Sequence, residues 1–181
     1  MLEWMFLFAA YLCAGFTLKL GDDLLDELKE PNMATMPLGL SGLIFGLLMS
    51  NSEWDLALLT AIVIGVILSG KVNKPQFLIG FILIGIVLVL NGLPAVSDII
   101  IWFVVLLVLL FTAILDEIQN DRADKNSDTI RSKFFLYRFT MKLSVLILAI
   151  LMPQFLPTAI GLWMFDTGYE TARVIVRRTR P

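Results

Sequence analysis

Apolar segments of membrane-crossing length occupy most of this chain and restrict what it can fold into. Runs of roughly 15 to 20 apolar residues match the thickness of a bilayer when they form helices. The composition excludes a water-soluble domain of this size, because 58% of the residues are hydrophobic and the mean hydropathy is +0.85. The candidate segments lie at residues 2–20, 36–50, 54–69, 75–91, 97–115, 134–151 and 154–169.

These segments predict the fold class. A backbone that faces lipid must satisfy its hydrogen bonds within its own segment, and the sequence lacks the alternating pattern of a barrel. We therefore expect an all-α, polytopic membrane bundle of about seven transmembrane helices. One transmembrane domain is expected over residues 1–181, with a basic cytosolic tail at 170–181.

Positive charge alternates from one connection to the next and predicts the orientation. All 14 Lys and Arg residues lie in or beside the connections at 19–29, 71–74, 122–142 and 173–180. The connections between these contain none, at 50–53, 91–98 and 153–157. By the positive-inside rule, this predicts a multi-pass protein of the cell membrane with its N-terminus outside and its C-terminus in the cytoplasm. The basic cluster at 173–181 is interpreted as an anchor to anionic lipid, not as a nucleic-acid site.

The residue types present restrict which metal sites and catalytic sites the chain can form. Histidine is absent and Cys13 is the only cysteine. Zinc, haem and Ser-His-Asp sites are therefore not expected, and no disulfide can form within the chain. The first apolar segment has no basic residue before it and no signal-peptide cleavage site, so we expect it to be retained as a membrane span.

Two acidic triplets follow apolar segments with the same spacing of i, i+3 and i+7. They are Asp23, Asp26 and Glu30, and Asp121, Asp124 and Asp128. On a helix these positions lie within roughly 60° of one another, so each triplet is predicted to form one acidic stripe at a helix end. Like charges and the helix dipole both destabilise such a stripe, and Lys29 alone cannot neutralise the first one. Mg²⁺ or Ca²⁺ would relieve the repulsion. A solvated acidic segment beside the membrane is the alternative.

The acidic motifs resemble those of the UbiA superfamily of intramembrane prenyltransferases. DDLLDELKE at 22–30 is similar to the first motif of that family, and EIQNDRADKNSD at 117–128 is similar to the second. Weaker matches are KEPN at 29–32 and KVNKPQFLIG at 71–80. The resemblance covers roughly residues 10–140 and implies a UbiA-like bundle whose two motifs face each other at the cytosolic mouth of a cavity.

The resemblance also implies an activity, which is the Mg²⁺-dependent transfer of an isoprenyl group from a prenyl diphosphate to a membrane-borne acceptor. The acceptor would be a lipid or a quinone precursor. The implied metal ligands are Asp22, Asp23, Asp26, Glu30, Asp121, Asp124 and Asp128, of which Asp23, Asp26, Asp121 and Asp124 are implied to be catalytic. Candidate donors to the diphosphate are Lys71, Lys74, Arg131 and Lys133, for which a topological or lipid-binding role is the alternative.

The chain departs from the family pattern in four ways, one of which is that MATMPLG at 33–39 lacks the basic residues expected after the first motif. Asp22 stands where the family usually has Asn, and Glu30 replaces a final Asp. The first motif follows the first helix, whereas the family usually has nine helices with this motif on the second. Three alternatives follow for the cavity: it is incomplete, it is closed by a second copy of the chain, or it cannot hold an acceptor. Gly42 and Gly46 form a small-xxx-small pair that predicts close helix packing within the bundle, with a dimer contact as the alternative.

Two other functions remain open from the sequence. One is a divalent-cation transporter or channel built from two pseudo-repeated halves. Against it, no carboxylate lies near the middle of a predicted span, since Asp116 and Glu117 are at an edge and Asp166 is close to the end of the last one. The other is a non-catalytic relative that binds prenyl diphosphate lipids.

Overall fold

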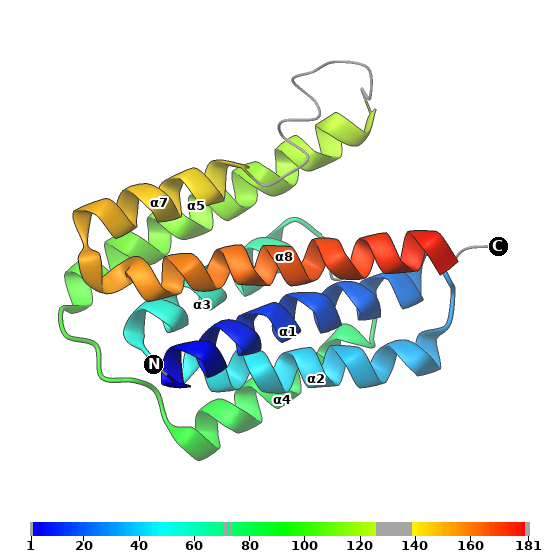
Figure 1. Cartoon of the computed structure of the whole chain (residues 1–181), viewed down its shortest axis with the longest axis horizontal. Coiled ribbons are helices and arrows are strands. Elements are labelled where there is room, and N and C mark those ends of the chain that lie inside the picture. Colours follow the sequence, from blue (N-terminus) through cyan, green and yellow to red (C-terminus); the bar gives the residue numbers. More distant parts are fainter. Residues whose placement is uncertain (1, 71, 73, 126–138, 180–181) are drawn as a thin grey trace. The chain divides into compact units, whose positions relative to one another are not determined.

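The regular structure of this protein consists of helices (Figure 1). The computed structural model describes residues 2–70, 72, 74–125 and 139–179, and no strand occurs among them. The prediction of an all-α chain is confirmed for this part. The helices are α1 (Leu2–Asp26), α2 (Pro31–Met49), α3 (Glu53–Leu68), α4 (Phe77–Asn91), α5 (Ile99–Lys125), α7 (Phe139–Leu151), the short 3₁₀-helix η1 (Pro153–Phe155) and α8 (Leu156–Thr179).

Three of the described helices contain stretches long and apolar enough to cross a membrane. These stretches are Glu3–Asp26 in α1, Pro31–Met49 in α2 and Ile99–Asp116 in α5. Helices α4 and α7 are also apolar but have only 15 and 13 residues. Since a helix rises 1.5 Å per residue, α4 is roughly 22 Å long, less than the roughly 30 Å of a hydrocarbon core. Seven full spans therefore stay a prediction.

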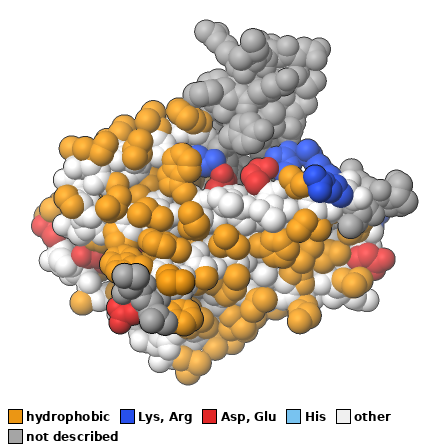
Figure 2. Space-filling view, in the orientation of Figure 1, with side chains coloured by type: hydrophobic (Ala, Val, Ile, Leu, Met, Phe, Trp, Pro, Cys, Tyr) orange, Lys and Arg blue, Asp and Glu red, His pale blue; other side chains and the backbone are white. Residues whose placement is uncertain are grey.

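The exposed surface is rich in apolar side chains. Figure 2 shows hydrophobic side chains spread over much of the face in view. On α4, the exposed residues Leu78, Ile82, Ile86 and Val89 follow each other at helical spacing, and Val89 is 84% exposed. Such a continuous apolar stripe is unusual for a protein surrounded by water and suits contact with lipid.

The helices gather into two compact units, which are described separately. Unit 1 comprises Met1–Ser52, Lys74–Pro94 and Ile160–Pro181, and contains α1, α2, α4 and most of α8. Unit 2 comprises Glu53–Asn73 and Ala95–Ala159, and contains α3, α5, α7, η1 and the first residues of α8. A single transmembrane domain over the whole chain stays a prediction.

Local signals set the helix ends. Pro31 begins α2, a position where the missing N–H of proline is not needed. Gly92 ends α4 with a φ of 82°, which glycine adopts without steric cost. At the start of α5, the Asp98 carboxylate accepts hydrogen bonds from the N–H groups of Ile100 and Ile101 at 2.9 and 3.1 Å. This is the usual arrangement of an N-cap.

Helices α1 and α8 approach each other closely in unit 1 because glycines line their contact. A Cβ atom on Gly15 would lie 1.9 Å from the carbonyl oxygen of Phe165, and one on Gly168 would lie 2.0 Å from that of Leu12. Tyr11, which is fully buried, packs against Gly161 in the same contact. No larger residue fits at these positions unless the helices move apart.

The α2–α4 contact, also in unit 1, uses the glycine pair found in the sequence. A Cβ on Gly42 would lie 2.3 Å from the carbonyl oxygen of Gly80, and one on Gly46 would lie 2.6 Å from the Cβ of Val87. The prediction of close packing within the bundle is confirmed for both residues. Small residues of this kind let helix backbones approach where lipid supplies no hydrophobic driving force.

Unit 2 is held by polar contacts near the start of α3. Asp55 is 1% exposed, and its Oδ1 accepts a hydrogen bond of 2.7 Å from the hydroxyl of Thr158. The indole N–H of Trp102 donates to the carbonyl of Glu53 at 2.8 Å. The Glu53 carboxylate accepts from both the N–H and the hydroxyl of Ser97. These contacts connect α3 to the start of α5 and to the start of α8 within the unit.

Substituting Gly42 by alanine is expected to destabilise the protein. The added methyl group would clash with the backbone of Gly80. A backbone cannot move aside as a side chain can, so α2 and α4 must separate. We expect a loss of about 1–3 kcal/mol in the free energy of unfolding, the usual cost of overpacking. Gly85→Ala on α4 is the matched control, because a Cβ there meets nothing within 4 Å. Unfolding of both variants in detergent micelles checks this, and equal stabilities would contradict it.

Candidate functional site

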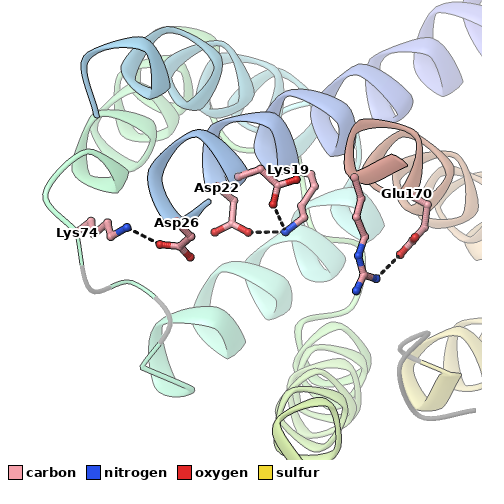
Figure 3. Close-up of polar contacts among 7 residues, drawn as sticks. Lys19, Asp22, Asp26, Lys74 and Glu170 are labelled. Atoms are coloured by element: carbon pink, nitrogen blue, oxygen red, sulfur yellow. Dashed lines mark hydrogen bonds and ion pairs between the residues drawn. The ribbon is translucent and has the colours of Figure 1, made fainter. Parts of the chain in front are cut away.

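A lysine and two aspartates converge at the C-terminal end of α1. Lys19 Nζ lies 2.8 Å from Asp22 Oδ2 and 2.7 Å from Asp23 Oδ1 (Figure 3). The three residues stand at i, i+3 and i+4 on one helix, the spacing at which opposite charges meet. Two of the predicted metal ligands, Asp22 and Asp23, therefore share one cation from their own helix.

This cluster is largely enclosed. The side chain of Asp23 is 3% exposed and that of Lys19 is 13% exposed, whereas that of Asp22 is 30% exposed. Helix α8 contributes Tyr169, whose ring centroid lies 5.2 Å from Lys19 Nζ. An ammonium group at this distance is attracted by the negative face of an aromatic ring. The cluster therefore consists of one cation, two carboxylates and one ring, contributed by two helices of unit 1.

Another ion pair lies at the end of the same helix. Lys74 forms an ion pair with Asp26 (Figure 3). Its ammonium also donates a hydrogen bond of 2.8 Å to the carbonyl oxygen of Leu25. The last carbonyls of a helix lack partners within the helix and carry partial negative charge, so a lysine there is stabilising. The structure thus brings together two predicted site residues, Asp26 and Lys74, from segments that are distant in the sequence. Both side chains are partly exposed, 57% and 33%.

The first acidic stripe is shorter than predicted. Helix α1 ends at Asp26, and Glu30 is the residue before α2, where its N–H donates to the carbonyl of Leu24 at 2.8 Å. The chain turns at Lys29, which has a left-handed φ of 56°. The prediction that Asp23, Asp26 and Glu30 share one face of a single helix is therefore wrong for Glu30. The physical reason is the proline at position 31, because the residue before a proline is disfavoured in helical conformation.

The structure describes less of the second motif. Asp121 and Asp124 lie on α5, and only their backbone is described. They belong to unit 2, whereas the first motif belongs to unit 1. That the two motifs face each other stays a prediction. Four predicted site residues lie outside the described residues: Lys71, Asp128, Arg131 and Lys133.

A carboxylate earlier on α5 has a structural role that the sequence analysis missed. Asp116 is 2% exposed, and its two oxygens accept hydrogen bonds from the N–H groups of Thr140 and Met141 at 3.0 and 2.8 Å. These N–H groups lie in the first turn of α7, where a helix has donors without partners of its own. Asp116, which lies on α5, thus caps the N-terminus of α7 in unit 2.

Two counter-ions in unit 1 were also missed, for different reasons. Lys19 was interpreted only as a topological charge, although its spacing from Asp22 and Asp23 is a sequence signal for helical ion pairs. The pairing of Lys74 with Asp26 joins residues 48 apart and has no such signal. The sequence analysis considered only Lys29 as a cation for the first motif, whereas the structure pairs three of its aspartates with Lys19 and Lys74.

The first motif offers carboxylate oxygens as possible ligands for a metal ion. Asp22 and Asp23 each direct a carboxylate oxygen to the same ammonium, so a positive charge is already held between them. Carboxylate oxygens are the ligands that Mg²⁺ prefers. Among the side chains that the structure describes, no group of three or more carboxylates or thiols is arranged to hold one metal ion. Further ligands would have to come from elsewhere in the chain or from substrate.

Comparison of the chain with protein-family models, with curated proteins and with solved structures found no match. The resemblance to the UbiA superfamily therefore rests on the residues of the two acidic motifs.

Substituting Asp23 by asparagine is expected to destabilise the protein more than the same change at Asp26. Asp23 is buried against Lys19. When its charge is removed, the enclosed ammonium of Lys19 keeps only the carboxylate of Asp22 as a partner. We expect a cost of about 1–3 kcal/mol for weakening a buried charged contact. Asp26 is exposed, and an exposed pair contributes less than about 1 kcal/mol. Thermal unfolding of Asp23→Asn and Asp26→Asn in micelles checks the order, and a larger loss for Asp26→Asn would contradict it.

Proposed function

We propose that this protein transfers an isoprenyl group from a prenyl diphosphate to a hydrophobic acceptor in the membrane, in the manner of the UbiA superfamily. The observation that carries the proposal is the convergence of Asp22 and Asp23 on one cation at the end of a helix of membrane-crossing length. A substrate with an apolar chain and an anionic headgroup needs this combination of an apolar surface and a compensated charged end.

In the proposed reaction, the bond between the prenyl carbon and the diphosphate oxygen breaks, and a bond from that carbon to a nucleophilic atom of the acceptor forms. The diphosphate leaves with the electron pair, and the acceptor loses a proton. Bound Mg²⁺ would stabilise the negative charge that develops on the departing diphosphate.

The chain's own residues have separate parts in this proposal. Asp22, Asp23 and Asp26 are the proposed Mg²⁺ ligands of the first motif, and Asp121 and Asp124 are those of the second. Lys74, an ammonium beside the end of α1, would assist the binding of the diphosphate. Other proposed roles rest on the sequence alone. The proposed metal ligands of this kind are Glu30 and Asp128, and the proposed donors to the diphosphate are Lys71, Arg131 and Lys133.

A transfer assay tests the proposed function. Purified full-length chain in lipid nanodiscs would be incubated with labelled farnesyl or geranylgeranyl diphosphate, Mg²⁺, and quinone-precursor and glycerophosphate lipids. We expect label in one lipid class and a decrease of about a hundredfold or more in rate for Asp23→Asn and Asp121→Asn, because charge stabilisation in the reaction is lost.

Glu3→Gln is the matched control for these variants, since Glu3 is an exposed carboxylate in the first turn of the same helix α1. It should keep the wild-type rate. Absence of label from every lipid, or wild-type rates in both aspartate variants, would remove the proposal.

The proposed orientation has the N-terminus outside and the C-terminus in the cytoplasm of a cell-membrane protein. It is supported by the basic end of α8, where Arg177 and Arg178 are exposed in the last turn. The predicted basic tail is thus a continuation of this helix as far as Thr179. Anionic lipid is the proposed partner of these arginines, and a second copy of the chain is the proposed partner that completes the cavity.

A divalent-cation transporter is a second candidate, and one observation favours it. Asp166 was expected close to the end of the last span, but α8 extends to Thr179, so this carboxylate lies near the middle of the helix. Carboxylates within membrane-spanning helices often mark ion pathways, so this candidate requires α8 to span the membrane. The transferase is preferred because α8, which carries Asp166, is not among the described helices that are apolar over a membrane-crossing length.

Ion uptake into liposomes separates the two functions. If the chain is a transporter, Mg²⁺ or Ca²⁺ uptake should be lost in Asp166→Asn and Asp124→Asn and kept in Glu3→Gln. If it is a transferase, liposomes with the wild-type chain should take up no more of either ion than empty liposomes. The measurement is the signal of a dye for divalent ions enclosed in the liposomes.

A further inference from the structure

Helices α1 and α8 run side by side and in the same direction in unit 1 (Figure 1). Gly15 of α1 meets the backbone of Phe165 of α8. Further along both helices, the ammonium of Lys19 lies over the ring of Tyr169. Ala172, in the next turn of α8, is fully buried. The two helices therefore stay packed as they approach the charged end of α1.

This register places Arg173 of α8 beside that charged end. Arg173 follows Tyr169 by four residues, so it lies on the same side of α8 as the ring that covers Lys19. Asp23 follows Lys19 by four residues on α1. Because the helices are parallel, Arg173 is level with the turn of α1 that carries the buried carboxylate.

The guanidinium of Arg173 keeps N–H groups for a further partner. It pairs with Glu170 of its own helix at 3.4 Å between Nη1 and Oε1, which is long for a hydrogen bond (Figure 3). An arginine side chain has five N–H donors, and one contact of this length uses a single donor. The two lysines at this end of α1, Lys19 and Lys74, already hold aspartates. The side chain of Arg173 is 28% exposed, so an anion can reach it.

We propose that Arg173 is a substrate-binding residue that donates hydrogen bonds to the diphosphate of the prenyl donor at the end of α1. This inference rests on the proposed function, which supplies the diphosphate. A planar guanidinium presents two parallel N–H groups that match two oxygens of a phosphoryl group. Arg173 lies outside residues 10–140, which the family resemblance covers, so the acidic motifs do not assign it.

Binding of the donor tests this residue apart from catalysis. The full chain in nanodiscs of zwitterionic lipid would be titrated with labelled farnesyl diphosphate in the presence of Mg²⁺. We expect Arg173→Gln to bind it about tenfold more weakly than wild type, the usual effect of losing a charged hydrogen bond. Farnesol lacks the diphosphate, so wild type and variant should bind it equally. Equal affinity of wild type and Arg173→Gln for farnesyl diphosphate would overturn the proposal.

Arg178→Gln is the matched control. Arg178 is exposed and lies on the opposite side of α8 from Tyr169, because nine residues make two and a half turns of a helix. In zwitterionic lipid, the change should alter the affinity for farnesyl diphosphate by less than about threefold. Equal weakening by Arg173→Gln and Arg178→Gln would show an effect of net charge alone and would overturn the assignment.

Anionic lipid headgroups are the other source of phosphoryl groups at this end of the chain. Nanodiscs with and without phosphatidylglycerol separate the two sources. Weakening by Arg173→Gln in both kinds of nanodisc supports binding of the donor, whereas weakening only where phosphatidylglycerol is present overturns it.

A second variant covers loss of folding. Arg173→Lys keeps the charge but not the planar fork, and it should bind farnesyl diphosphate about threefold more weakly than wild type. Should Arg173→Gln fail to fold, weaker binding by Arg173→Lys supports the proposal, and binding equal to wild type overturns it.

The role of Arg173 and the transferase fail separately. In the transfer assay, Arg173→Gln should raise the KM for the prenyl diphosphate and leave the KM for the acceptor unchanged. Transfer by wild type together with equal donor affinities in wild type and Arg173→Gln would overturn the role of Arg173 and leave the transferase. Weaker donor binding by Arg173→Gln without transfer to any lipid would support that role and remove the transferase. Absence of donor binding by wild type would overturn both.

Discussion

The compensation of charge at the end of α1 is the interaction on which the rest of the structure depends. This helix is apolar over a membrane-crossing length and then carries three aspartates within two turns. Enclosed charges are costly unless they have partners within the protein. Lys19 supplies a partner for Asp22 and Asp23, and Lys74 supplies one for Asp26. The negative end of the helix is thereby made compatible with a folded unit.

The placement of Tyr169 over this ion-pair cluster depends on how closely helices α1 and α8 approach in unit 1. Gly15 and Gly168 allow the backbones of α1 and α8 to come into contact, and Tyr169 is the residue after Gly168. The close approach therefore sets the distance between the ring of Tyr169 and the ammonium of Lys19. The same principle acts between α2 and α4, where Gly42 meets Gly80. Small residues thus serve the site as well as the packing, because they bring charged and aromatic side chains of separate helices together.

Much of the fold was predictable from hydrophobic pattern and local signals. The candidate segment at 97–115 corresponds to the apolar part of α5, and the segment at 75–91 corresponds to α4. The glycine pair on α2 was correctly assigned to close packing. The end of α1 was missed although Pro31 signals it, because the regular spacing of the acidic residues was interpreted as a continuing helix. The end of α8 was missed because its final turns are polar, and hydropathy identifies only apolar helix.

The candidate site was predictable in its residues but not in its contacts. Asp23 and Asp26 follow from the spacing of the first acidic triplet, and Asp22 was named through the resemblance to the UbiA motif. The ion pair with Lys19 could have been inferred from helical periodicity. Lys74 reaches Asp26 only because its segment packs beside α1 in the folded unit. The burial of Asp23 and Asp116 likewise comes from neighbouring helices.

By itself, the sequence determined that this chain is helical and apolar and that its acidic residues stand in two spaced groups. These properties follow from the composition and from the spacing of residues along one helix. Both are set by residues close together in the sequence. Only the tertiary structure decided which cation each carboxylate holds and which of them is enclosed, since enclosure depends on side chains from helices that are distant in the sequence.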